Sequence, residues 1–142
     1  MSHCGDIRAH ISASLGGARR YAGVDAHDLA LRRRIFESFA ATGEPPSDID
    51  GLDSLAEQHV VVLRDGRIWM AHPFAAHHDG ARVESGGRVW WGNCAWDGLG
   101  IVAALGLEAW TVTAQGVTLP SDDAVFHVLV PARHWWDDIG FT

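Results

Sequence analysis

The stretch RVWWGNCAWDGLGIVAALG, residues 88–106, decides the fold class because its first part has the composition of a strand and its second part that of a helix. Valine and tryptophan at 88–91 favour a strand, and Gly86-Gly87 before them is typical of a hairpin turn. We expect a buried helix to follow, with Asn93 as its N-cap and Gly106 at its end. Its apolar set is Cys94, Leu99, Ile101, Val102 and Leu105.

Further strands are predicted on both sides of this stretch. ARVES at 81–85 is the partner strand in the hairpin, and AWTVTA at 109–114 follows the helix. AVFHVLV at 124–130 is nearly all apolar, which indicates a central strand. Residues 79–142 therefore predict a sheet domain with one central helix.

The N-terminal half has a different order of elements. Residues 1–27 are interpreted as a loose leader, and a helix with one apolar stripe is expected from Asp28 to Gly43. A shorter helix capped by Ser47 should follow, and then a hairpin that turns at Asp65-Gly66. Helix, helix and hairpin is the order of a winged-helix module. The predicted fold class is thus α+β, with a small winged-helix-like unit at 28–78 packed on the sheet domain.

Composition and charge exclude several classes of protein. The chain has 142 residues, 47% of them hydrophobic, and a net charge of -7. The positive residues are all arginines and are scattered except for Arg32-Arg33-Arg34, which together with the negative net charge argues against a surface that follows nucleic-acid phosphates. We expect no membrane span, because no apolar run approaches the roughly 20 residues that one needs, and no signal peptide. A cytoplasmic location is the expectation, and in that reducing compartment Cys4 and Cys94 are expected to be free thiols.

Cys94 and Asp97 form the candidate reactive pair. A thiol in the first turn of a helix faces unpaired backbone N–H groups, which should lower its pKa and favour the nucleophilic thiolate. Asp97 follows at i+3 on the same helix face, and partial burial among tryptophans should raise its affinity for a proton. The alternative is structural: Cys94 as a small buried hydrophobe, and Asp97 as a first-turn residue favoured by the helix dipole.

Three blocks of the sequence resemble the organomercurial (alkylmercury) lyase family. They are RIWMAHPF at 67–74, RVWWGNCAWDGLGI at 88–101 and FHVLVPARHWWDDIGFT at 126–142. The helical and hairpin unit also fits the winged-helix-like N-terminal domain of that family. The resemblance implies an alkylmercury-lyase-like sheet domain and a role in mercury resistance.

The resemblance also implies the chemistry. Cys94 would be a mercury ligand, and Asp97 a ligand or proton relay, acting together with a second cysteine. The thiolates would bind an organomercury cation, protonolysis would cleave the carbon–mercury bond, and Hg(II) would pass to a thiol or mercuric-ion acceptor. No organic cofactor is implied.

In the family the second cysteine follows the segment that reads DIGFT here, and this chain ends at Thr142. One interpretation is a truncated or degenerate homologue with little turnover, because a single thiolate binds the organomercury cation without adding the electron density that assists protonation. The other is a hypothesis: a selenocysteine codon, read as a stop, ended the reading frame. Full-length product without selenium on elemental analysis would exclude it.

Two other functions stay open. One is a mercury-binding protein without turnover. The other is a winged-helix transcription regulator that senses a ligand, although its DNA-reading helix would come from the acidic segment SDIDGLDSLAEQ at 47–58.

The histidines and tryptophans are further candidate site residues. The nine histidines lack the spacing of a zinc site, so most are interpreted as surface or loop residues. Tryptophans can line an apolar pocket for an alkyl or aryl group, although packing in the core is their commoner role. The candidate pocket residues are Trp90, Trp91, Trp96, Trp135 and Trp136.

Overall fold

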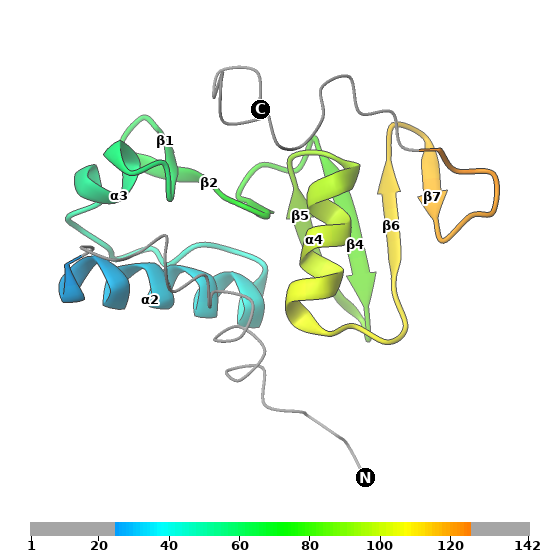
Figure 1. The fold of residues 1–142 in the computed structure, drawn as a ribbon, viewed down its shortest axis with the longest axis horizontal. Coiled ribbons are helices and arrows are strands. Elements are labelled where there is room, and N and C mark those ends of the chain that lie inside the picture. The colour runs from blue at the N-terminus through cyan, green and yellow to red at the C-terminus, as the bar shows by residue number, and fades with distance from the viewer. Residues whose placement is uncertain (1–24, 126–142) are drawn as a thin grey trace, which may run out of the picture.

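The structure is a computed structural model, and it describes residues 25–125 (Figure 1). Within this range the chain forms three helices and seven strands in two antiparallel sheets. The predicted leader up to residue 24 and most of the predicted strand at 124–130 lie outside the described residues. So do Cys4, His127, His134, Trp135 and Trp136.

Helix α2 runs from Ala26 to Thr42 and confirms the first predicted helix. It begins two residues before the expected Asp28, because the Asp25 side chain accepts a hydrogen bond from the backbone N–H of His27 at 2.6 Å. Gly43 ends it in the left-handed conformation, with φ of 81°, and its N–H donates to the carbonyl of Phe39 at 2.8 Å.

Helix α3 is shorter than predicted, spanning Asp53–Glu57. The expected cap by Ser47 is wrong, because the helix begins after Leu52 and has no side-chain cap, while Gly51 at φ of 74° turns the preceding chain. A buried carboxylate ties α3 to α2 instead. Asp28 accepts hydrogen bonds from Ser54 Oγ at 2.6 Å and from Gln58 Nε2 at 2.8 Å.

The first sheet contains the predicted hairpin. Strands β1 (Val62–Arg64) and β2 (Arg67–Ala71) pair across Asp65 and Gly66, whose φ angles of 51° and 72° suit a tight turn. A third strand that the sequence did not predict, β3 (Phe74–Ala75), pairs with β2. The order of helices and hairpin is as expected, and the winged-helix assignment itself stays a prediction.

The second sheet contains the strands β4 (Ala81–Ser85), β5 (Arg88–Gly92), β6 (Thr111–Ala114) and β7 (Val117–Leu119). Their order is β5-β4-β6-β7, and the sheet is antiparallel throughout. Helix α4 (Ala95–Leu105) packs on one face of this sheet (Figure 1). The predicted strands are found at β4, β5 and β6, and β7 is an additional strand after the turn at Gln115-Gly116.

Gly98 sets how closely α4 approaches the sheet. A Cβ atom at this position would lie 2.6 Å from Val112 Cγ1 and 3.2 Å from Ala81 Cβ. Only a residue without a side chain fits that spacing, so α4 rests directly on β4 and β6. This packing fixes the first turn of the helix, which carries Asp97.

The core continues across the predicted domain boundary near residue 78. One cluster of buried apolar residues includes Phe39 of α2, Phe74 of β3 and Val83 of β4. The rings of Phe39 and Phe74 stack with centroids 5.3 Å apart, and Trp90 Nε1 donates to the carbonyl of Ala40 at 3.2 Å. The boundary stays a prediction.

Among residues 25–125, no helix has both the length and the apolar character that crossing a membrane requires.

Candidate functional site

Cys94 lies where β5 ends and α4 begins. It is the N-cap residue of the helix, with φ of -144° and ψ of 175°, so the predicted cap at Asn93 is wrong by one residue. Its carbonyl accepts the first bond of the helix, from Gly98 N at 3.0 Å. The residue is exposed rather than part of the predicted apolar face, so the interpretation of Cys94 as a small buried hydrophobe is also wrong.

Asp97 is buried in the first turn of the same helix, with 5% of its surface exposed. Gly92 at the end of β5 makes room for it, because a Cβ there would lie 2.8 Å from Asp97 Cβ. A buried carboxylate needs a polar partner. Its partner is His72, whose Nδ1 lies 2.8 Å from Asp97 Oδ1.

His72 follows β2 directly and is 70% exposed at its side chain, in contrast to the buried carboxylate that it contacts. The contact raises the pKa of His72, because a hydrogen bond to Asp97 stabilises the charged imidazolium more than partial burial destabilises it. Sequence reasoning missed this pair. His72 lies in the turn after β2 and Asp97 lies in helix α4, so no local pattern of the sequence joins them.

The pKa of the Cys94 thiol is raised, which contradicts the predicted lowering by the helix N-terminus. Although the residue as a whole is exposed, neighbouring protein atoms partly desolvate its sulfur, and this desolvation is the main cause. The backbone N–H groups of Asp97 and Trp96 lower the pKa as expected, but the negative charge of the Asp97 carboxylate raises it again. Cys94 is therefore mainly a thiol at neutral pH, with a carboxylate close enough to affect its proton.

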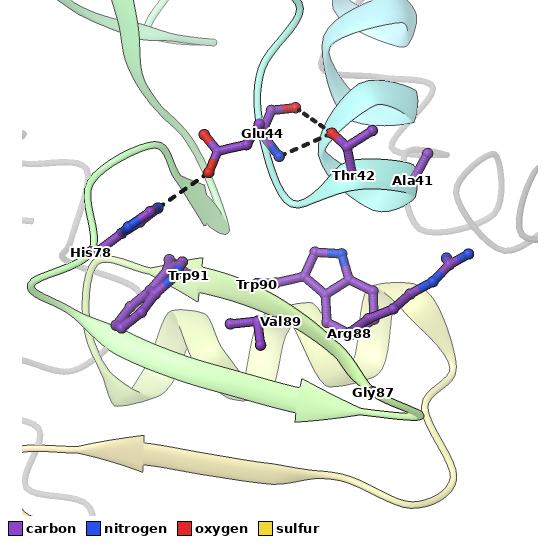
Figure 2. Close-up of a pocket in the computed structure, with 9 residues that line it drawn as sticks. All are labelled: Ala41, Thr42, Glu44, His78, Gly87, Arg88, Val89, Trp90 and Trp91. Carbon is purple, nitrogen blue, oxygen red and sulfur yellow. Dashed lines mark hydrogen bonds and ion pairs between the residues drawn. The ribbon is translucent and has the colours of Figure 1, made fainter.

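The tryptophans near this pair are not gathered around it. Trp96 is 50% exposed beside Cys94, whereas Trp90 is buried against α2. Trp90 and Trp91 instead line a pocket of about 400 Å³ between the end of α2 and strand β5, and neither Cys94 nor Asp97 is among its lining residues (Figure 2). A substrate pocket formed by all five tryptophans stays a prediction.

Polar side chains close one end of this pocket. Glu44 Oε1 and His78 Nε2 are 3.2 Å apart, and the His78 ring stacks on Trp91 with centroids 5.0 Å apart (Figure 2). Hydrogen bonds between Thr42 and the backbone of Glu44 hold the loop after α2 in place.

Within the described part of the chain, no group of three or more His, Cys, Asp or Glu side chains is arranged to hold a metal ion. His77 stacks on Trp69 with centroids 4.6 Å apart, and His78 pairs with Glu44. His72 is the histidine that the structure brings to the candidate pair.

Comparisons with known proteins do not assign the chain to a family. No protein-family model, no curated protein and no solved structure matches it. The candidate site is thus defined by the structure alone: it consists of the exposed residue Cys94 with its thiol, the buried carboxylate of Asp97 and the exposed imidazole of His72.

Proposed function

We propose that this protein is an organomercurial lyase-like protein that cleaves the carbon–mercury bond of an organomercurial by protonolysis. The observation that carries the proposal is the placement of an exposed thiol, Cys94, three residues before a buried carboxylate that is close enough to affect its proton. The two groups supply the two requirements of the reaction, a soft ligand for mercury and a proton donor for carbon.

The proposed reaction has two steps. In the first, Cys94 sulfur binds the mercury of R–Hg–X, the anion X⁻ leaves, and the thiol proton passes to the Asp97 carboxylate. In the second, a small external thiolate binds the mercury as its second sulfur ligand, and Asp97 gives that proton to the carbon bound to mercury. The electron pair of the carbon–mercury bond forms the new C–H bond, R–H leaves, and Hg(II) stays on the sulfur until an external thiol removes it.

A raised thiol pKa is compatible with this sequence of steps. The proton is still on sulfur when the substrate arrives, so binding of mercury delivers it to Asp97 at the start of the reaction. Burial of Asp97 keeps that proton from being lost to bulk water before the carbon is protonated. Trp96 follows Cys94 by two residues and is 50% exposed, so in this proposal its ring is the candidate apolar contact for the organic group.

The test is release of hydrocarbon from phenylmercuric acetate. The protein is incubated with this compound and an excess of a small thiol, which supplies a second thiolate and accepts the Hg(II), and benzene is measured by gas chromatography of the headspace. We expect benzene above the level of a protein-free control, none above it from Cys94→Ser, and bound phenylmercury without benzene from Asp97→Asn.

Two controls make the result specific. Cys4→Ser removes the other thiol of the chain and should leave benzene release unchanged. Binding of phenylmercury by the unaltered protein without any release would reject the lyase and leave the mercury-binding alternative. Unchanged binding by Cys94→Ser would reject both.

A further inference from the structure

The contact between His72 and Asp97 can fix the orientation of the Asp97 carboxyl group. Nδ1 of His72 lies 2.8 Å from Oδ1 of Asp97, and the histidine side chain is 70% exposed while that of the carboxylate is 7% exposed. The contact therefore joins an exposed imidazole to a buried carboxylate. The pairing joins the end of β2 to the first turn of α4.

A carboxyl group that must accept and return a proton needs one defined oxygen for it. The oxygen that accepts an N–H hydrogen bond has a lone pair already engaged, so the acidic proton is favoured on the other oxygen. With Oδ1 engaged by His72, that oxygen is Oδ2. The side-chain torsions of Asp97 are restricted by the same bond.

We propose that His72 is a positioning residue for the proposed protonolysis, holding Asp97 through Nδ1–H so that Oδ2 receives the Cys94 proton and returns it to carbon. This inference rests on the proposed function. It requires only that Nδ1 donates, so it holds for the neutral imidazole as well as for the imidazolium.

His72→Asn tests whether the hydrogen bond that His72 donates is the property that matters. Asparagine places an amide N–H close to the position of Nδ1 and does not titrate, whereas alanine removes the donor. His72→Ala and His72→Asn are compared with the unaltered protein for bound phenylmercury and for single-turnover release of benzene in excess small thiol. His27→Ala, another exposed histidine, is the matched control.

We expect all four proteins to bind phenylmercury through Cys94. His72→Ala should release benzene about tenfold or more slowly, because a misplaced proton donor loses its reaction geometry. His72→Asn should restore most of the rate, and His27→Ala should not change it. An unchanged rate in His72→Ala overturns the inference, and so does His72→Asn as slow as His72→Ala.

A second measurement keeps the inference testable if the unaltered protein releases no benzene. Alkylation of Cys94 by iodoacetamide is followed by mass spectrometry of its peptide. If His72 holds Oδ2 toward the thiol, His72→Ala loses that alignment, weakens the effect of the carboxylate on the thiol proton and speeds alkylation, while His72→Asn does not. Faster alkylation together with absent release supports positioning and rejects the lyase. Unchanged alkylation in His72→Ala, with no release, rejects both.

Discussion

At the scale of single residues, Cys94 is governed by two opposing effects at one helix end. The N–H groups of the first turn favour the thiolate, whereas partial burial and the charge of Asp97 favour the thiol, and the second pair prevails. A cysteine at a helix N-terminus is thus made reactive only when its neighbours do not oppose the helix dipole.

The balance of these effects determines how the reactivity of Cys94 depends on pH. Because the folded pKa of Cys94 is raised, its alkylation by iodoacetamide should increase with pH through a midpoint above that of a free cysteine. Asp97→Asn removes a cause of the shift, so the midpoint should fall and the rate at neutral pH should rise, by up to about tenfold for each unit of pKa. The rate is read from the Cys94 peptide by mass spectrometry, which excludes Cys4.

Glu108→Gln is the matched control for this experiment. It removes the same charge from an exposed position beyond the far end of α4 and should leave the profile unchanged. A midpoint in Asp97→Asn equal to that of the unaltered protein would show that the carboxylate does not influence the thiol.

At the scale of elements, Gly98 allows α4 to pack closely against the sheet. Gly98→Ala should lower the free energy of unfolding by about 1–3 kcal/mol, because its Cβ would lie 2.6 Å from Val112 Cγ1, although alanine is the better helix former. Unfolding in urea measures the loss. Val112→Ala removes the obstructing methyl group, so the double variant should be more stable than the sum of the two changes predicts, by at least about 0.5 kcal/mol. Simple additivity would contradict the proposed contact.

The bond between α2 and α3 gives a prediction on pH. Hydrogen bonds from Ser54 and then Gln58 lower the pKa of Asp28 below its ordinary value of 3.8. A depressed folded pKa adds stability above the ordinary pKa, and this stability is lost as pH falls through the folded pKa. Asp28→Asn should therefore lower Tm by a few degrees near neutral pH, and the difference in Tm between the variant and the unaltered protein should become smaller below pH 3.8. Calorimetry at several pH values measures both Tm values. Asp53→Asn, which changes an exposed residue of α3, should have the same Tm as the unaltered protein at each pH.

The elements that the sequence predicted are those with local signals. Gly43 and Gly106 end helices in the left-handed conformation, and Asp65-Gly66 and Gly86-Gly87 form hairpin turns, all from their own backbone preferences. Strands β3 and β7 were missed because two or three residues of ordinary composition carry no period. They are stabilised as strands by pairing with β2 and β6.

The candidate site was predictable in part for the same reason. Cys94 and Asp97 are close in sequence, and the helix between them is a local structure. His72 was not predictable, because it meets Asp97 only when β2 and α4 are brought together by the whole fold. The pKa direction of Cys94 was missed because the sequence shows the helix dipole but not the extent of burial.

At the scale of the whole molecule, the site depends on both halves of the chain, because His72 precedes residue 78 and Asp97 follows it.

The hydrophobic core shared by the two halves should make them unfold together. Phe39 is fully buried and stacks on Phe74, so Phe39→Ala should cost about 3–5 kcal/mol. Hydrogen exchange should then accelerate by the same factor in β4 and β6 as in α2, whereas Leu29→Ala, a partly exposed position on α2, should change neither. Acceleration confined to residues before 78 would show two independent domains, and the pair of His72 and Asp97 would then join domains that can separate.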